Sequence, residues 1–502
     1  MLNITLSTKS FWENEAEGYI FFLNEDFEVK GDLLKVEEIY SHLKDRLKKH
    51  QFTGKKGESF VLTSLKDDKL ISFIFIGIGK CDGLWYKELE VLRRAVGASV
   101  KRLKDLDIPT AVIEFPCCSF KDVECKEILR QVAVIAKMAD YEFKSFKSAK
   151  DNKDWNGSIS IITNSKDPKE LEKSISEGIL IGDAINKSRK LCDMPPNIAT
   201  PTFVANEAKK IAETHNLKYE EFGREKAQEL GMGGFLCVDE GSDRDGKFVV
   251  LEYKSDAKNA KTIALVGKGV TFDSGGISLK PSSHMSGMKY DMSGAAAVLG
   301  AINAIAELKP NVNVIAITPL VENMPSGKSS KQDDIIRFMN GKTAEVKNTD
   351  AEGRLILADA LCYAEKFYNP DIIIDLATLT GACVYALGHF YSAVMSFDKE
   401  LVDEISKSGF KTGDKVWELP FDEDYHKAIE SDVADISNTG SPAYSAGTMT
   451  AGLFLSNFVD KPRWAHIDIA GTADAVPNVN YLGKGATGTG IRLLIDFVLK
   501  QQ

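Results

Sequence analysis

In its second half the chain alternates short apolar segments with longer amphipathic ones, and this alternation constrains the fold more than any other feature. Residues 247–253, 262–266 and 312–318 are short, rich in β-branched residues and predicted to form strands. Residues 293–308 and 355–368 have the length and apolar spacing of helices. Strands that alternate with crossover helices belong to a mainly parallel sheet covered by helices on both faces. We therefore predict an α/β fold, with a functional site beyond the carboxyl ends of the strands.

The first part of the chain shows a similar alternation but no recognisable chemical constellation. We predict an amphipathic helix at 86–103 and strands at 19–23, 71–76, 110–115 and 158–163. This part is expected to be a smaller α/β domain with a structural or assembly role.

The length of the chain and a pair of prolines set the predicted domain boundaries. At 502 residues the chain is too long for one ordinary core. A helix is predicted from 167 to 189, and Pro195 and Pro196 prevent it from continuing. We predict an N-terminal domain at 1–165, a connecting helix at 166–195 and a larger C-terminal domain at 196–502.

Composition and charge argue against several classes of protein. The sequence is 43% hydrophobic and 27% charged, as globular domains are, and has no apolar run of the roughly 18 residues that would suggest a membrane span. Its net charge of −10 disfavours nucleic acid or an anionic membrane as the main partner. The eight cysteines form no Cys-x-x-Cys pair and no secretory signal is visible, which together favour the cytoplasm.

A first charged cluster directly follows the predicted strand at 262–266. It contains Lys268, Asp273 and Lys280, and Asp291 comes after a segment that is predicted to be a loop. We expect these side chains at the edge of the sheet where the parallel strands end.

A second charged cluster, Asn348–Arg354, precedes the helix predicted at 355–368. If residues 350 to 354 are extended, Asp350, Glu352 and Arg354 point to the same side. An isolated stretch of this kind is most often a solvated loop, but the first cluster changes the interpretation. Together the two clusters place four carboxylates at the tips of neighbouring strands.

Four carboxylates without a histidine motif suit hard or borderline divalent cations. Two divalent cations balance the four negative charges, and two metals that share a water are a standard arrangement for hydrolysis. Lys280 is a candidate for polarising a carbonyl, and Arg354 for binding an anion. Lys268 is either an ordinary counter-ion or, if nearby dications remove its proton, a metal ligand.

Residues 266–276 and 348–354 closely resemble the two signatures of the M17 leucyl aminopeptidases, also called the cytosol aminopeptidase family. The likeness extends over most of residues 190–495, including 291–296 and 377–382. The resemblance implies a metal-dependent aminopeptidase that removes leucine-like N-terminal residues from peptides, so that 196–502 would be its dinuclear-metal catalytic domain.

The resemblance also implies a role for each candidate residue. Lys268 and Asp291 would hold the tighter metal, and Asp350 the more exchangeable one. Asp273 and Glu352 would bridge both. Lys280 would polarise the substrate carbonyl, and Arg354 would hold a bicarbonate ion that acts as general base. The residues implied for the substrate pocket are Met288, Thr378, Leu379 and Gly381.

The family further implies two divalent metal ions per subunit, Mn²⁺ or Zn²⁺, and a homohexamer in the cytoplasm. Two alternatives remain open from the sequence: an additional DNA-binding role, which the acidic balance disfavours, and a carboxylate-metal phosphoesterase, for which no phosphate-cradling loop is found. The glycine-rich motif at 483–488 is followed by too few residues for a dinucleotide fold. His466 is predicted to be a hydrogen-bonded histidine in a strand.

Overall fold

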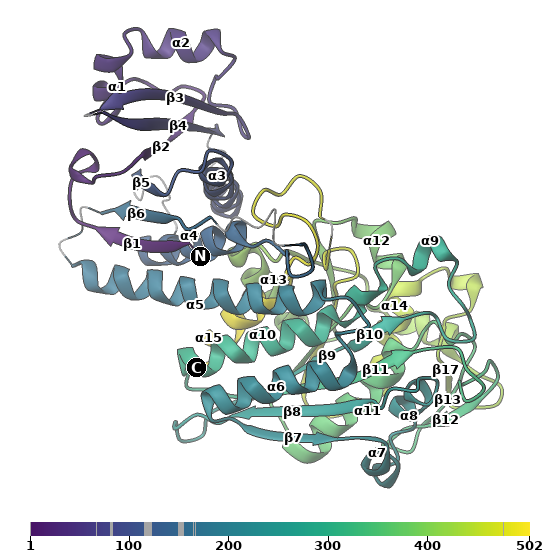
Figure 1. Ribbon diagram of the computed structural model, residues 1–502. Helices are drawn as coiled ribbons and strands as arrows, with labels where there is room; N and C mark the ends of the chain where they lie inside the picture. Colours follow the sequence, from purple (N-terminus) through teal and green to yellow (C-terminus); the bar gives the residue numbers. More distant parts are fainter. Residues whose placement is uncertain are drawn as a thin grey trace. The chain divides into compact units, whose positions relative to one another are not determined.

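The computed structural model describes residues 2–66, 68–80, 84–114, 123–148, 155–163, 165, 167–474 and 476–502. The chain forms two compact units, one of residues 1–186 with 478–483 and one of residues 187–477 with 484–502 (Figure 1). In the part of the chain that the structure describes, no helix is both long enough and apolar enough to cross a membrane.

The N-terminal unit is built on a six-stranded sheet of order β1-β6-β5-β2-β4-β3, in which only β3 and β4 are antiparallel. Leu89, Leu92, Val96 and Val100, the residues that predicted the helix at 86–103, are all buried, because they form one face of α3. An aromatic cluster that includes Phe21 and Phe75 fills part of the core. The predicted elements are confirmed, except that residue 115 lies outside the described residues. The strands are β1 (Asn3–Ser7), β2 (Gly18–Asn24), β3 (Ser59–Lys66), β4 (Lys69–Gly79), β5 (Thr110–Glu114) and β6 (Ser158–Ile162), and the helices η1 (Phe11–Glu13), α1 (Leu33–Ile39), α2 (Leu43–Lys49), α3 (Trp85–Asp105) and α4 (Cys125–Asp140).

The predicted connecting helix is α5 (Pro168–Asp193). It ends at residue 193, shortly before the prolines at 195 and 196. A proline has no N–H group to donate to the preceding turn, so the helix cannot continue through them. Since α5 contributes residues to both compact units, the exact domain boundaries at 165, 195 and 196 remain predictions.

The C-terminal unit contains a nine-stranded sheet of order β16-β15-β18-β14-β9-β11-β8-β7, with β10 beside β11. The central strands are parallel, and antiparallel pairs occur at β7/β8, β8/β11 and β15/β18, so the predicted mainly parallel sheet is confirmed. The strands are β7 (Lys218–Phe222), β8 (Lys247–Tyr253), β9 (Thr262–Gly267), β10 (Gly269–Asp273), β11 (Asn313–Asn323), β14 (Ile372–Ala377), β15 (Ser392–Met395), β16 (Val416–Glu418) and β18 (Arg463–Asp468), and a small separate sheet contains β12 (Ile335–Arg337), β13 (Thr343–Glu345) and β17 (Ile436–Ser437).

Helices cover this sheet in two groups. One group packs α10 against α6 and α15, and the other packs α11 against α8 and α14, while α10 and α11 both contact β9 (Figure 1). Ala264 and Val266 of β9 belong to the same apolar cluster as α11, because alternate residues of a strand point to the same face. The helices are α6 (Pro201–His215), α7 (Arg224–Leu230), α8 (Gly233–Asp239), α9 (Ser282–Met285), η4 (Met288–Met292), α10 (Ser293–Leu308), α11 (Gly353–Tyr368), α12 (Gly381–Leu387), α13 (Lys399–Thr412), η5 (Glu423–Ile429), η6 (Pro442–Tyr444), α14 (Gly447–Ser456) and α15 (Ile491–Leu499).

One local prediction is wrong, and one strand beside the site was missed. The segment from 281 to 290, predicted as a loop, contains α9 and the start of η4, both too short to show helical periodicity in the sequence. The strand β10 was not predicted, because its five residues carry the polar signature that was assigned to the site.

Candidate active site

Three parallel strands of the C-terminal unit end side by side at the site. Leu376 of β14 lies opposite Gly267 of β9, and Ala377 of β14 lies opposite Asp468 of β18. Lys268 and Thr378 are the residues that directly follow two of these strand ends. The register of the sheet therefore brings the two charged clusters together at its carboxyl edge.

The stretch Asn348–Arg354 reaches the site through the start of α11. Glu352 has right-handed helical backbone angles, φ −78° and ψ −35°, so residues 350 to 354 are not all extended, the condition under which alternation placed their charges on one side. Gly353 is the first residue of α11, and a Cβ at this position would lie 2.5 Å from Lys268 Cε. Glycine lets the helix begin this close to the lysine, because any larger residue would displace the Lys268 side chain from its two carboxylates.

Two lysines each lie between two carboxylates. Lys268 Nζ is 2.8 Å from Asp291 Oδ2 and 2.9 Å from Glu352 Oε1. Lys280 Nζ is 2.7 Å from Asp273 Oδ2 and forms a second ion pair with Asp350. We call these six residues, Lys268, Asp273, Lys280, Asp291, Asp350 and Glu352, the charged cluster.

Burial dominates the electrostatics of the charged cluster. It raises the pKa of Asp291, Asp350 and Glu352, and the charges of neighbouring carboxylates raise them further. Burial lowers the pKa of Lys268, but the surrounding carboxylates more than offset this and raise it above the usual value. The repulsion between the carboxylates and the raised pKa of Lys268 both reflect an excess of negative charge in the cluster.

The donor set fits divalent cations. Asp273, Asp350 and Glu352 each bring a carboxylate oxygen to within 4.8 Å of the others, and all three atoms are hard ligands. Glu352 Oε2 is buried and accepts no hydrogen bond from any described residue, which is a costly state for a carboxylate oxygen without a cation. If all four carboxylates of the charged cluster are ionised, they carry two more charges than the two lysines that pair with them.

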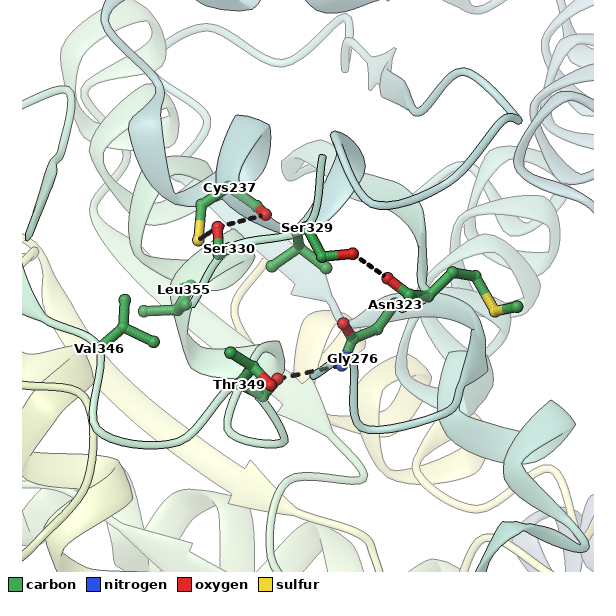
Figure 2. Close-up of a pocket in the computed structure, with 10 residues that line it drawn as sticks. Cys237, Gly276, Asn323, Ser329, Ser330, Val346, Thr349 and Leu355 are labelled. Atoms are coloured by element: carbon green, nitrogen blue, oxygen red, sulfur yellow. Dashed lines mark hydrogen bonds between the residues drawn. The ribbon is translucent and has the colours of Figure 1, made fainter. Parts of the chain in front are cut away.

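Asn323 at the end of β11 supports the charged cluster and was missed in the sequence. Its side-chain amide donates to Asp273 Oδ1 at 2.8 Å and to the Thr349 carbonyl at 3.1 Å, which ties the two sequence clusters together. Behind them lies a small pocket whose lining includes Asn323, Thr349, Gly276 and Cys237 (Figure 2). Burial raises the pKa of the Cys237 thiol to about 12, so this cysteine is a packing residue and not a nucleophile.

Arg354 lies in the first turn of α11 and is buried. Its guanidinium donates to the Asn438 carbonyl at 2.9 Å, while its Nε has no hydrogen-bond partner among the described residues. Burial lowers the pKa of Arg354 to about 10, which still leaves it charged at neutral pH. A buried cation with a free donor is suited to an anion of one negative charge.

The residues predicted for the substrate pocket lie on two segments. Met288 begins η4 and is half-buried. Thr378, Leu379 and Gly381 follow β14, and the Thr378 hydroxyl donates to Asp291 Oδ1 at 2.8 Å. The segment that follows β14 is thus hydrogen-bonded directly to the charged cluster.

His466 lies in β18, as predicted, and its Nδ1 is 2.6 Å from Asp375 Oδ1. The prediction that it is fully hydrogen-bonded is only half correct, because its Nε2 has no partner in the described residues. Burial lowers the pKa of His466, but Asp375 and Asp468 offset this and raise it.

Comparison with known proteins places the chain in a family. The model described as "Cytosol aminopeptidase family, catalytic domain" matches residues 186–495, and the model of the family's N-terminal domain matches residues 20–150. Because the catalytic-domain model covers more than half of the chain, the chain belongs to the cytosol aminopeptidase family, and it is an aminopeptidase, a hydrolase. Members of this family depend on metal ions, which agrees with the carboxylates of the charged cluster.

Individual relatives agree over most of the chain. A "Probable cytosol aminopeptidase" from Desulfotalea psychrophila is 39% identical and covers 97% of both chains. One from Chlorobium limicola is 43% identical and covers 82% of this chain and 84% of its own. Among solved structures, a mutant of tomato leucine aminopeptidase superposes with a TM-score of 0.88 at 31% identity and covers 100% of this chain and 97% of its own. The two-domain α/β fold is therefore shared with a leucine aminopeptidase.

Proposed function

We propose that the chain removes leucine-like residues from the N-termini of peptides with the help of two divalent metal ions, Mn²⁺ or Zn²⁺, bound at the charged cluster. The convergence of Asp273, Asp350 and Glu352, with Glu352 Oε2 lacking a partner among the described residues, is the observation that carries this proposal. The similarity to a tomato leucine aminopeptidase supports the preference for leucine.

The resemblance to the family assigns the metal ligands within the cluster. Lys268 and Asp291 would hold one ion, Asp350 the other, and Asp273 and Glu352 both. Lys268 can serve as a ligand only as a neutral amine, a state that nearby dications favour because like charge lowers the pKa of an ammonium group. When bound, the two ions would supply an activated water and polarise the scissile carbonyl.

Lys280 is proposed to stabilise the negative charge that develops on the carbonyl oxygen. Asp273 and Asp350 hold its ammonium group in place, and the pKa of Lys280 is raised because these carboxylates outweigh the effect of burial. The two ion pairs hold the Lys280 ammonium group beside the proposed metal ligands, from where it can donate a hydrogen bond to the carbonyl oxygen.

Arg354 is proposed to hold a bicarbonate ion, and its unpaired, buried Nε supports this. The bicarbonate would supply a general base when bound. The positive charge and fixed position of Arg354 are the contributions of the chain itself.

The peptidase proposal is tested by comparing leucine amide with N-acetyl-leucine amide before and after chelation. A free α-amine can bind at a metal, so the acetylated substrate should be inert, and chelation should abolish turnover until Mn²⁺, Zn²⁺ or Co²⁺ is restored. Full activity at a confirmed metal content near zero would overturn the two-metal proposal. Equal turnover of the acetylated substrate would overturn the requirement for a free N-terminus. A panel of phosphate esters tests the alternative that the enzyme is a phosphoesterase.

The resemblance also leads us to propose a cytoplasmic homohexamer, with an assembly role for the N-terminal domain. The names of the relatives support the cytoplasmic assignment. Sedimentation velocity of the full chain should give the mass of six copies, and a monomer at micromolar concentration would contradict the proposal.

A further inference from the structure

Asp468, the last residue of β18, was not predicted to belong to the site, yet it contacts a segment that does. It is fully buried, and its Oδ1 accepts hydrogen bonds from the backbone N–H groups of Leu379 at 3.2 Å and Ala470 at 3.1 Å. Its Oδ2 accepts a hydrogen bond from the Thr380 hydroxyl at 2.7 Å. Two of these three donors belong to the segment that follows β14.

The same segment contacts the charged cluster at its other end. The Thr378 hydroxyl donates to Asp291 Oδ1 at 2.8 Å, and the Thr378 carbonyl accepts from Lys268 Nζ at 2.9 Å. A run of three residues is therefore held by the charged cluster at its first residue and by Asp468 at its second and third.

Other buried polar side chains lie near Asp468 in the sheet. His466 precedes it by two residues in β18, and two residues along a strand point to the same face. Asp375 binds His466 Nδ1 at 2.6 Å and accepts a hydrogen bond from the indole N–H of Trp464 at 2.8 Å. The three hydrogen bonds that Asp468 accepts from Leu379, Ala470 and Thr380 supply the polar partners that a buried carboxyl group at the end of β18 requires.

We propose that Asp468 is a positioning residue that fixes the segment Thr378–Thr380 and thereby determines which N-terminal side chains the enzyme accepts. The inference rests on the proposed place of Leu379 in the substrate pocket. A hydrogen bond to the Leu379 N–H fixes the peptide plane before this residue, and the bond to Thr380 fixes the turn after it. Asp468 acts through these contacts and has no part in the chemistry.

The measurement is the ratio of kcat/KM for leucine p-nitroanilide to kcat/KM for alanine p-nitroanilide in the metal-loaded enzyme. The ratio is independent of the fraction of folded or metal-loaded molecules, so a purely structural defect leaves it unchanged. Asp468→Asn keeps the shape of the side chain but replaces one acceptor and removes the charge. We expect it to lower the ratio about tenfold, the usual value of a hydrogen bond to a charged group.

Thr380 provides a matched pair of variants that leaves the buried carboxylate in place. Thr380→Val keeps the shape and removes the hydroxyl that donates to Asp468, so the ratio should fall. Thr380→Ser keeps the hydroxyl and should restore most of the ratio. This pair tests the proposal even if Asp468→Asn does not fold.

Asp414→Asn is the control for a buried aspartate with a structural role only. Asp414 forms an ion pair with Arg492, and its Oδ2 accepts the N–H groups of Arg492 at 3.0 Å and Leu493 at 3.3 Å at the start of α15. Asp414→Asn should lower the Tm and leave the ratio unchanged.

The outcomes separate this inference from the assignment of the pocket. If Leu379→Ala changes the ratio while Asp468→Asn and Thr380→Val do not, Asp468 does not position the segment. If Leu379→Ala also leaves the ratio unchanged, the assignment of Leu379 to the pocket is wrong.

Discussion

The charged cluster, of which only Lys280 and Asp350 are half-buried and the rest buried, and the buried Asp414–Arg492 pair both lie in the C-terminal unit, but they balance their charges differently. Asp414 pairs with the Arg492 guanidinium and accepts hydrogen bonds from the backbone N–H groups of Arg492 and Leu493 at the start of α15, so its charge is matched. In the charged cluster, four carboxylates share two ammonium groups and two negative charges remain. Because an unmatched buried charge is expensive, such an excess indicates a cation site.

We expect the balanced Asp414–Arg492 pair to contribute to stability and the unbalanced charged cluster to contribute to function. Removing a charge from the matched pair should lower stability and spare the chemistry. Removing a carboxylate charge from the charged cluster should relieve repulsion between the remaining carboxylates and abolish the chemistry instead. Four variants test this contrast, in order of their expected effect on turnover.

Glu352→Gln should have the largest effect. The substitution keeps the shape but removes a proposed bridging ligand, so metal content and kcat should fall together. The loss of kcat should exceed the ~10²–10³-fold that a single electrostatic group contributes. Metal analysis and kinetics on leucine amide measure both, and a Glu352→Gln enzyme with full metal content and turnover would remove the basis for the contrast.

Lys280→Ala should lower kcat by about 10²–10³-fold and leave both metal ions bound. The reason is that Lys280 is proposed to stabilise the transition state and is not a ligand, so kcat should fall rather than KM alone rise. Loss of a metal ion in this variant would instead make Lys280 a structural counter-ion like Arg492.

Arg354→Ala should lower kcat less than Lys280→Ala, because water can partly replace a bicarbonate base. Added bicarbonate should stimulate the parent enzyme and have little effect on the variant, as a titration of rate against bicarbonate would show. A variant that responds to bicarbonate as the parent does, or that has lost a metal ion, contradicts the role given to Arg354.

Asp414→Asn should have the smallest effect on turnover. It leaves Arg492 buried beside a neutral group, which should lower the free energy of unfolding by about 3–5 kcal/mol, as when other buried ion pairs lose one partner. Urea denaturation measures the loss of stability, and kcat per folded molecule should stay at the parent value. A fall in kcat comparable to that of Lys280→Ala would mean that stability and chemistry are not separable in this unit.

Periodicity in the sequence determined the class of the fold and the longer elements of the second half that precede the site. The alternation of segments from 247 to 368 predicted β8, β9, β11, α10 and α11, because burial of alternate or every third to fourth residue leaves a pattern that needs no knowledge of neighbours. The short elements α9, η4 and β10 leave too little pattern and were missed or misassigned. Other elements of the same unit were not predicted either, among them α7, α8, α12, α13 and α14.

The sequence also indicated which residue types belong at the site, since its two signatures contain four of the six members of the charged cluster, and Lys280 and Asp291 follow the first signature. Only the tertiary structure decided how they are grouped. The pairing of Lys268 with Asp291 and Glu352, and of Lys280 with Asp273 and Asp350, joins residues up to 84 positions apart in the sequence. The parts played by Asn323 and Asp468 left no local signal, because a single polar residue at the end of an apolar strand becomes a support only through the register of the strands beside it.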